Sequence, residues 1–348
     1  MATTRGKYRF SFGPWNIDEG ADPFGPAVRR AQAFSKKVKL YRDLGYRGVQ
    51  FHDDDAVPEI DSKTPDQMLR QARRVRTVLD GEGLKAEFVA PRLWFSPKTI
   101  DGAYTSNNAA HRRYALQRSY QSIDIANALG CDLIVLWLAR EGTYCREAKN
   151  AREAVLRILD AINRMLRYDP RIRIVIEPKP NEPMDHAYIP TIGHAIALAY
   201  RSVDPSRVGG LIESAHAILA GLDPSDEMAY ALAHDKLWSV HLNDQNGPKF
   251  DQDKSFGSVN LRRAFNQVRV LEEYGYGNRG EFVGMDVKAM RTQKAEVATK
   301  HLRNSRDTFL RLLEKVVTID KAREQELIAQ RDYEELDRYV LNHIMGRK

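Results

Sequence analysis

Apolar and polar residues alternate along the chain in two different rhythms. Short runs rich in β-branched and aromatic residues recur, and longer stretches with an apolar residue at every third or fourth position lie between them. The short runs predict strands at Tyr8–Phe12, Gly48–Phe51, Lys85–Ala90, Asp132–Trp137, Arg173–Ile176, Gly209–Ile212, Leu237–Leu242 and Glu281–Met285. The clearest helices are expected at Val28–Leu44, Pro65–Leu79, Ala109–Leu129, Ala151–Leu166 and Leu261–Tyr274.

Strands that alternate with helices in this way predict an α/β protein, and specifically a (β/α)8 TIM barrel. A Rossmann fold is disfavoured because no glycine-rich phosphate fingerprint follows the first strand. We expect a catalytic barrel domain in residues 1–315 and a short, charged helical tail in residues 316–348. The tail lies outside the barrel units, so we expect it to pack on the barrel or to make subunit contacts.

Polar and aromatic side chains follow the predicted strands at their carboxyl ends. In a TIM barrel these ends meet at one mouth, where the active site lies. The side chains concerned are His52, Trp94, Trp137, Glu177, Glu213, His241, Asn243 and Asp286. Each alone has an ordinary reading as surface polarity or barrel packing, and it is their joint placement that predicts a site.

The chemistry of these residues indicates a metal centre. Glu177, Glu213 and Asp286 would repel one another strongly at one mouth, and divalent cations would relieve that repulsion. Oxygen-rich ligation suits magnesium or manganese. His216 lies just past Glu213, and Asp251 and Asp253 share one side of an extended loop. The candidate ligands are Glu177, Glu213, His216, His241, Asp251, Asp253 and Asp286, more than one ion needs, which predicts two ions.

The exit from the fifth predicted strand is unusually rigid. It reads Glu-Pro-Lys-Pro-Asn-Glu-Pro over Glu177–Pro183, and its prolines restrict the backbone. Alternation puts Lys179 on the same side as Glu177. A cation beside a metal-binding carboxylate is suited to polarise an oxygen of the substrate.

With these motifs in place, the chain resembles the xylose isomerase family, most closely its shorter-chain class. The matching stretches follow in the same order along the chain. They are Phe12-Gly13, Asp22–Gly25, Phe51–Asp55, Trp137, Arg140–Gly142, Glu177–Pro183, Glu213–His216, Asp251–Asp253, Asp286, Lys288 and the C-terminal helix near Leu336.

The resemblance implies a metal-dependent aldose–ketose isomerase that converts D-xylose to D-xylulose, and possibly D-glucose to D-fructose, by a hydride shift assisted by two divalent ions. It implies one ion held by Glu177, Glu213, His241 and Asp286, and a second held by Glu213, His216, Asp251 and Asp253. The implied catalytic residues are His52 for opening of the sugar ring, Asp55 to orient it, and Lys179 at the carbonyl oxygen. The implied substrate contacts are Trp15, Trp94, Trp137, Asn243, Lys288 and, from a neighbouring subunit, Phe24.

One departure from the family concerns the metal ligands. The family pattern His-x-Asp-Leu-Asn reads Ser239-Val240-His241-Leu242-Asn243 here, so an imidazole replaces a carboxylate. The five remaining ligand carboxylates and two divalent ions leave a formal charge of −1 instead of −2. Nitrogen ligation shifts the expected metal from magnesium toward manganese, cobalt, iron, nickel or zinc. Asp244 could restore the charge, but strand alternation opposes this.

Other departures line the expected pocket. Ala90, Arg92 and Trp94 stand where the family tends to carry Thr, Asn and Phe. Arg92 could accept an acidic or phosphorylated sugar, or it could pair with a carboxylate. The tail is shorter than is usual for the class, so the resemblance leaves a homotetramer and a homodimer both open.

Composition adds limits to this picture. The chain has 54 Lys+Arg against 47 Asp+Glu, and its basic clusters lack interleaved aromatic residues, which argues against a nucleic-acid partner. No window approaches the roughly 18 apolar residues of a membrane helix, so no membrane partner is expected. The two cysteines lack disulfide or metal spacing. With no signal peptide, we expect a cytoplasmic protein whose partner is a small sugar.

Three other functions stay open. A relative that has drifted to another sugar, as an isomerase or epimerase, or that has weak xylose activity, would keep the same residues. A zinc-dependent nuclease acting on abasic DNA would share the barrel, but only His216 and His241 occupy ligand positions here, and such enzymes use several histidines. A binding protein without turnover would not need His52, Asp55 and Lys179.

Overall fold

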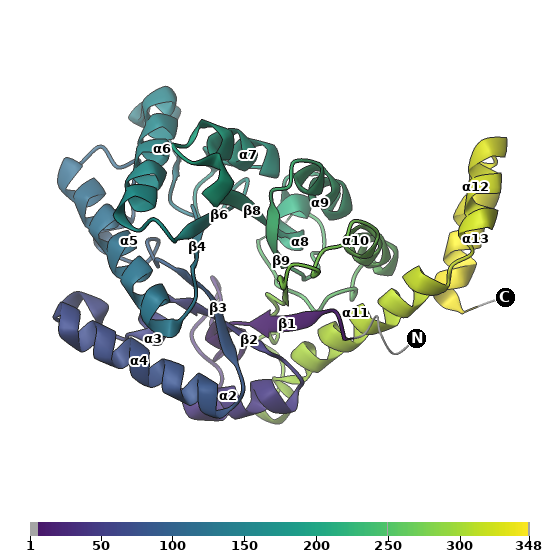
Figure 1. Ribbon diagram of the computed structural model, residues 1–348, viewed down its shortest axis with the longest axis horizontal. Coiled ribbons are helices and arrows are strands. Elements are labelled where there is room, and N and C mark those ends of the chain that lie inside the picture. Colours follow the sequence, from purple (N-terminus) through teal and green to yellow (C-terminus); the bar gives the residue numbers. More distant parts are fainter. Residues whose placement is uncertain (1–5, 249, 347–348) are drawn as a thin grey trace.

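The computed structural model describes residues 6–248 and 250–346, so residues 1–5 of the predicted barrel domain and residues 347–348 of the predicted tail lie outside the described residues. Eight parallel strands close into a barrel in the order β1-β10-β9-β8-β6-β4-β3-β2 (Figure 1). Their bounds are β1 Arg9–Phe12, β2 Gly48–His52, β3 Lys85–Ala90, β4 Leu133–Trp137, β6 Arg173–Glu177, β8 Val208–Glu213, β9 Leu237–His241 and β10 Phe282–Gly284. The prediction of a (β/α)8 barrel is confirmed.

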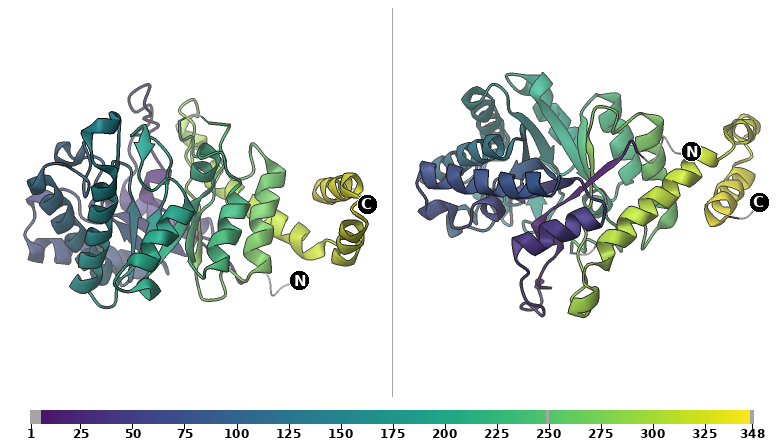
Figure 2. Two further views of the ribbon diagram at one scale, coloured as in Figure 1. Left: turned by 90° about the horizontal axis from the view of Figure 1, so that it is seen from above. Right: turned by 60° about the horizontal axis from the view of Figure 1, so that its bottom comes forward.

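Helices surround this barrel on its outer face (Figures 1 and 2). They are α2 Phe34–Asp43, α4 Pro65–Gly81, α5 Ala109–Leu129, α6 Ala151–Tyr168, α7 Ile192–Arg201, α9 Pro224–Ala233, α10 Leu261–Glu273 and α11 Lys300–Thr318. Short helices α3 Asp53–Ala56 and α8 Ser214–Leu219 follow β2 and β8 directly at the mouth of the barrel.

Smaller elements complete the connections. Beyond β4 and β6, the short strands β5 Gly142-Thr143 and β7 His186-Ala187 form an antiparallel pair. Single turns of 3₁₀ helix occur at η1 Pro14–Asn16, η2 Ile60–Ser62, η3 Pro97–Thr99, η4 Arg146–Ala148, η5 Pro205–Arg207 and η6 Ala295–Val297.

Aromatic rings of α11 and of the loop before β2 pack on β1, beside the point where β1 pairs with β10 to close the barrel. Phe309 of α11 is fully buried and makes edge-to-face contacts with Tyr8 and Phe10, at centroid distances of 5.0 and 5.3 Å. On the same side of β1, Phe12 packs edge-to-face on Tyr46 at 4.4 Å. Such pairs add to the area that each ring buries, so they hold α11 against β1.

The first predicted helix begins six residues too early. Val28–Leu44 was expected to be helical, but α2 begins at Phe34. The backbone N–H groups of Val28 and Arg29 both donate to Glu19 O, and the Arg29 guanidinium pairs with Asp18 at 2.9 Å. These contacts satisfy the hydrogen-bonding groups of the segment without a helix and attach it to the loop after β1. The other four predicted helices agree with α4, α5, α6 and α10 to within two residues.

The tail consists of two helices that project to one side of the barrel (Figures 1 and 2). They are α12 Lys321–Gln330 and α13 Tyr333–Met345, separated where Arg331 adopts a left-handed conformation (φ 56°) and Asp332 caps α13. Buried Glu324 pairs with Arg269 of α10 at 2.7 Å, so the tail packs on the barrel. Helix α11 runs through Thr318, and the domain boundary at residue 315 stays a prediction.

In the part of the chain that the structure describes, no helix combines the length and the apolar character needed to cross a bilayer.

The contact between α11 and β1 yields a stability prediction. Phe309→Ala should lower the free energy of unfolding by about 3–5 kcal/mol, because it leaves a cavity among Tyr8 and Phe10. Val317→Ala, at an exposed position of the same helix, should change it by less than about 0.5 kcal/mol. Urea unfolding followed by circular dichroism measures both. Equal effects of the two variants would contradict this account of barrel closure.

Candidate active site

A cavity of about 450 Å³ opens at the carboxyl ends of the barrel strands. Most of the side chains predicted from the sequence lie along its wall. These are Trp15, His52, Trp94, Trp137, Glu177, Lys179, Glu213, His216, His241, Asp251, Asp253, Asp286 and Lys288. The predicted residues Phe24, Asp55 and Asn243 do not line it, and their surroundings are described below.

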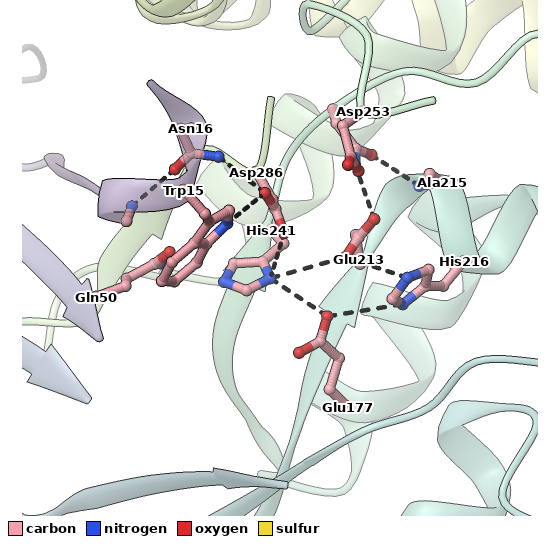
Figure 3. Close-up of polar contacts among 12 residues, drawn as sticks. Trp15, Asn16, Gln50, Glu177, Glu213, Ala215, His216, His241, Asp253 and Asp286 are labelled. Carbon is pink, nitrogen blue, oxygen red and sulfur yellow. Dashed lines mark hydrogen bonds and ion pairs between the residues drawn. The ribbon is translucent and has the colours of Figure 1, made fainter. Parts of the chain in front are cut away.

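Glu213 is the centre of this cavity. It ends β8, is almost fully buried, and belongs to three groups of side chains whose ligand atoms lie within 4.8 Å of one another. The groups are Glu177–Glu213–His241, Glu213–His216–Asp251 and Glu213–Asp253–Asp286. The structure thus brings all seven predicted metal ligands together around one carboxylate. Figure 3 shows Glu213 with Glu177, His216, His241, Asp253 and Asp286 around it.

The two imidazoles face Glu213 from opposite sides. His241 Nδ1 lies 3.3 Å from Glu177 Oε1 and 3.8 Å from both Glu213 Oε2 and Asp286 Oδ2. His216 Nε2 lies 3.0 Å from Asp251 Oδ2 and 3.3 Å from Glu213 Oε2. His241 thus presents one ring nitrogen to a set of carboxylate oxygens, as a metal ligand would. His216 faces them with both nitrogens, because its Nδ1 lies 3.6 Å from Glu177 Oε1.

Lysine and asparagine side chains hold the carboxylates of the loop after β9. Lys179 Nζ lies 2.9 Å from Asp251 Oδ2, and Lys288 forms an ion pair with Asp253. Asn243 donates from Nδ2 to Glu213 Oε1 at 2.8 Å and to Asp253 Oδ1 at 3.2 Å. Asn243 was predicted to touch substrate, but it lies behind the carboxylates and orients them instead.

Burial and mutual charge shift the titration of the cluster. Burial raises the pKa of Glu213 well above its ordinary value, and repulsion from Asp251 adds to the rise. Burial alone would lower the pKa of His241, but the neighbouring Glu177 raises it well above the ordinary value. Burial opposes ionisation of Glu177, yet the charge of His241 lowers its pKa to about 2. Protons on His241 and Glu213 therefore relieve repulsion that divalent cations would otherwise relieve.

The donor set fits divalent cations. His216 Nδ1 and Asp251 Oδ1 are buried and have no hydrogen-bond partner, and buried polar atoms of this kind are normally satisfied. Five carboxylates and two imidazoles are the ligand types that manganese, cobalt and zinc accept. The residues could hold one ion between Glu177, Glu213, His241 and Asp286, and a second between Glu213, His216, Asp251 and Asp253.

His52 forms a second polar group at the other side of the cavity. Its Nδ1 lies 2.8 Å from Asp55 Oδ2 and 2.6 Å from Arg92 Nη2. Arg92 also contacts Asp55 Oδ1 at 3.0 Å and Asp54 Oδ1 at 2.8 Å. Burial would raise the pKa of Asp55, but His52 and Arg92 lower it to about 2. Arg92 thus pairs with carboxylates, one of the two roles expected of it.

Aromatic rings wall the space between the two polar groups. Trp94 and Trp137 meet edge-to-face at 4.5 Å, and Lys179 Nζ lies 5.2 Å from the centre of the Trp137 ring. Trp15 packs on His52 at 4.2 Å and donates from Nε1 to Asp286 Oδ1 at 2.9 Å. The flat apolar faces leave a slot suited to a ring or chain of C–H groups with polar groups at its ends.

Phe24 lies outside this slot. Its side chain is 77% exposed and meets Phe250 edge-to-face at 5.4 Å. Its predicted contact with a neighbouring subunit's site stays a prediction. Asp244 also lies away from the cluster, because its carboxylate accepts from the backbone N–H groups of Val259 and Asn260 at 2.7 and 3.0 Å.

Sequence reasoning missed two residues that the site uses. Asn16 is fully buried and donates from Nδ2 to Asp286 Oδ1 at 2.8 Å. Glu182 lies 3.0 Å from Lys179 Nζ and accepts from Asp251 N at 3.0 Å, so it links the Pro-rich exit of β6 to the loop of Asp251. Glu182 stands within a motif that the sequence singled out, whereas Asn16 follows Trp15 with no pattern to mark it.

Known proteins resemble this chain in sequence. The family model described as a xylose isomerase-like TIM barrel matches residues 38–301. A xylose isomerase from Thermus thermophilus is 37% identical over 321 residues, which span 90% of this chain and 81% of that protein.

Solved structures resemble it in fold at low sequence identity. An IOLI protein with a bound zinc atom has a TM-score of 0.63 and 12% identity, covering 89% of this chain and 100% of that chain. A xylose isomerase domain protein from Alicyclobacillus acidocaldarius has a TM-score of 0.61 and 14% identity, covering 88% of this chain and 99% of that chain. A D-psicose 3-epimerase from Clostridium cellulolyticum H10, solved with D-tagatose, has a TM-score of 0.56 and 10% identity. The match covers 89% of this chain and 96% of that chain. At these identities the likeness concerns the fold alone.

The shared position of Glu213 yields a prediction about ion binding. Adding Co²⁺ or Mn²⁺ at about 100 times its dissociation constant should stabilise the chelator-treated protein by about 2.7 kcal/mol. Glu213→Gln should remove most of this gain, because every candidate ligand group contains Glu213. Glu153→Gln, at an exposed carboxylate of α6, is the control. A thermal shift that survives Glu213→Gln unchanged would show that the ions bind elsewhere.

Proposed function

The chain belongs to the xylose isomerase-like TIM barrel family, and we propose on that premise that it is a two-metal aldose–ketose isomerase. D-Xylose is the default substrate, and D-glucose a slower one. The observation that carries the proposal is the cavity in which Glu213 joins three ligand groups opposite His52, with Lys179 and the tryptophan rings beside them.

Two divalent ions would bind to the ligand sets around Glu213. When bound, they supply positive charge at the hydroxyl and carbonyl oxygens of a sugar and so favour movement of hydrogen between C1 and C2. Lys179 adds a third cation at the same wall of the cavity. Its partners Asp251 and Glu182, at 2.9 and 3.0 Å, keep the ammonium charged and hold it in place.

His52 is suited to move the proton that ring opening requires. An imidazole can take a proton at one nitrogen while a carboxylate orients the other, and Asp55 Oδ2 lies 2.8 Å from His52 Nδ1. The opposite edge of the ring faces the cavity. Trp15 and Trp94 pack on His52 at 4.2 and 5.1 Å, and their apolar faces exclude water from the space where a sugar would lie.

A second candidate is an isomerase or epimerase for another sugar, or an enzyme with weak xylose activity. It is favoured by the residues around His52, because Arg92 Nη2 lies 2.6 Å from His52 Nδ1 and competes there with Asp55. A nuclease is less well supported, since the ligand groups of the described residues contain only two histidines. We also propose a homodimer or homotetramer, in which the exposed ring of Phe24 would contact a neighbouring subunit.

The proposed activity is tested by stripping the protein of ions and incubating it with a panel of aldoses. Mg²⁺, Mn²⁺, Co²⁺ or Zn²⁺ is added in turn, and ketose is assayed. We expect D-xylose to yield ketose with at least one ion. Ketose from a different aldose alone would favour the second candidate, and ordinary ion binding with no ketose from any aldose would contradict an isomerase.

Lys179→Met tests the proposed role of the lysine. Ketose formation should fall by about 100-fold or more, because a charged group at the reacting oxygen is lost. Ion binding should be retained, since Lys179 Nζ and an ion compete for Asp251. Isothermal titration with Co²⁺ alone measures this second property. If the variant loses ion binding, Lys179 is structural and its assigned role is wrong.

His241→Asp tests the metal preference. A carboxylate in place of the imidazole should raise the affinity for Mg²⁺ relative to that for Co²⁺, because hard cations prefer oxygen ligands. The ratio of the two dissociation constants, measured in wild type and variant, reports the change. An unchanged ratio would mean that residue 241 does not ligate an ion.

A further inference from the structure

A group of polar side chains lies inside the barrel, deeper than the cavity. It consists of Ser11 of β1, Gln50 of β2, Glu87 of β3 and Ser239 of β9, all buried, and we call it the inner polar cluster. Gln50 Nε2 donates to Glu87 Oε2 at 3.1 Å, and Ser239 Oγ donates to Glu87 Oε1 at 3.0 Å. Ser11 Oγ also donates to Glu87. The cluster therefore converges on one carboxylate.

The charge of Glu87 lacks a nearby cationic side chain. Among the described residues, no lysine or arginine forms an ion pair with it, and its partners are two hydroxyls and an amide. Burial raises the pKa of Glu87, whereas the donors Ser11 and Gln50 and the charge of His241 oppose that rise. A carboxylate in such a place is costly unless a positive charge compensates it. The charged side chain that acts on Glu87 is His241 of the candidate metal centre.

His241 connects the inner polar cluster to the metal centre. Its Nδ1 faces the carboxylates of Glu177 and Glu213, while its Nε2 is buried without a hydrogen-bond partner. Gln50 Oε1 is likewise buried without a partner. The two atoms are complementary, because an imidazole N–H donates and an amide oxygen accepts. Figure 3 shows Gln50 on the side of the His241 ring opposite Glu213.

Gly284 of β10 provides the space for this approach. A Cβ at this position would lie 2.5 Å from Gln50 Nε2 and 2.9 Å from His241 Cδ2, the ring carbon bonded to Nε2. The Gln50 amide and the Nε2 edge of the imidazole thus flank the same point. Because Gln50 Nε2 donates to Glu87, the amide oxygen is the atom of Gln50 that is left to accept from His241 Nε2.

We propose that the inner polar cluster is the outer layer of the metal centre: Gln50 accepts the Nε2 proton of His241, and Glu87 holds the Gln50 amide in place. This inference rests on the proposed two-metal function. Pairing at Nε2 keeps Nδ1 deprotonated and directed at the ion, as the partners of metal-binding histidines generally do. Glu87 accepts from Gln50 Nε2 at 3.1 Å, which leaves the oxygen of that amide for the imidazole.

The experiment is a double-mutant cycle on ion binding alone, without sugar. Glu87→Gln and Gln50→Leu are each made in the natural protein and in a His241→Asp background, and Co²⁺ dissociation constants are measured against a chelating dye. In the natural protein, each variant should weaken Co²⁺ binding by about 10-fold or more. In the His241→Asp background, each should change it by less than about twofold, because residue 241 then has no Nε2 to position.

Two controls separate this role from a structural one. Glu324→Gln removes another buried carboxylate, far from the metal centre on α12, and should leave Co²⁺ binding unchanged. The Co²⁺ absorption spectrum should shift in Gln50→Leu as the ligand geometry of His241 changes. If Glu87→Gln does not fold, the Gln50→Leu cycle decides alone.

The outcomes distinguish this inference from the function on which it rests. Equal losses of Co²⁺ affinity with His241 and with Asp at position 241 would overturn the inference, as would no loss in either background. If the natural protein binds no Co²⁺ at all, the proposed two-metal function fails instead.

Discussion

Repulsion among buried carboxylates is the constraint on which the rest of this site depends. Two such charges 4 Å apart repel by about 4 kcal/mol even where water and protein dipoles screen them. Five meet around one cavity, and neighbouring side chains each compensate one of them. Lys179 and Lys288 pair with Asp251 and Asp253, and Asn243 donates to Glu213. Without such partners, and without protons or cations, the mouth of the barrel would not hold these groups together.

The barrel determines where this charge collects. Parallel pairing puts Glu177 level with Trp137 of β4, and Glu213 level with His241 of β9. Side chains far apart in the sequence thus end at one height above the barrel core. The apolar packing beneath and outside them, such as that of Phe309 on β1, does not depend on the ions. The fold can therefore position the ligands before any ion binds, and the cost of gathering like charges is met by hydrophobic burial elsewhere.

The fold and most of the site could be predicted from sequence because both follow local patterns. Strand ends recur with the barrel repeat, so Glu177, Glu213 and Asp286 were expected at one mouth, and the structure brings them together. The extent of the first helix was not predictable, since the contacts of Arg29 with the loop after β1 are long-range. The inward direction of Glu87 was not predicted for another reason. Val49 pairs with Ala86 and Phe51 with Val89, so β3 bulges opposite Gln50. The bulge turns both Glu87 and Phe88 inward, which strict alternation excludes.

The charge balance of the cavity also bears on the kind of substrate it suits. The chain carries a surplus of basic residues, and Arg92 brings one of them to His52, where it could have made a site for an acidic sugar. Asp54 and Asp55 occupy its guanidinium, at 2.8 and 3.0 Å, so little of its positive charge is left for a ligand. At the opposite wall, His241 stands where the family pattern has an acidic residue, and Glu87 of the inner polar cluster lies behind it. The charge of Arg92 is thus balanced locally, which agrees with the neutral sugar proposed as the substrate.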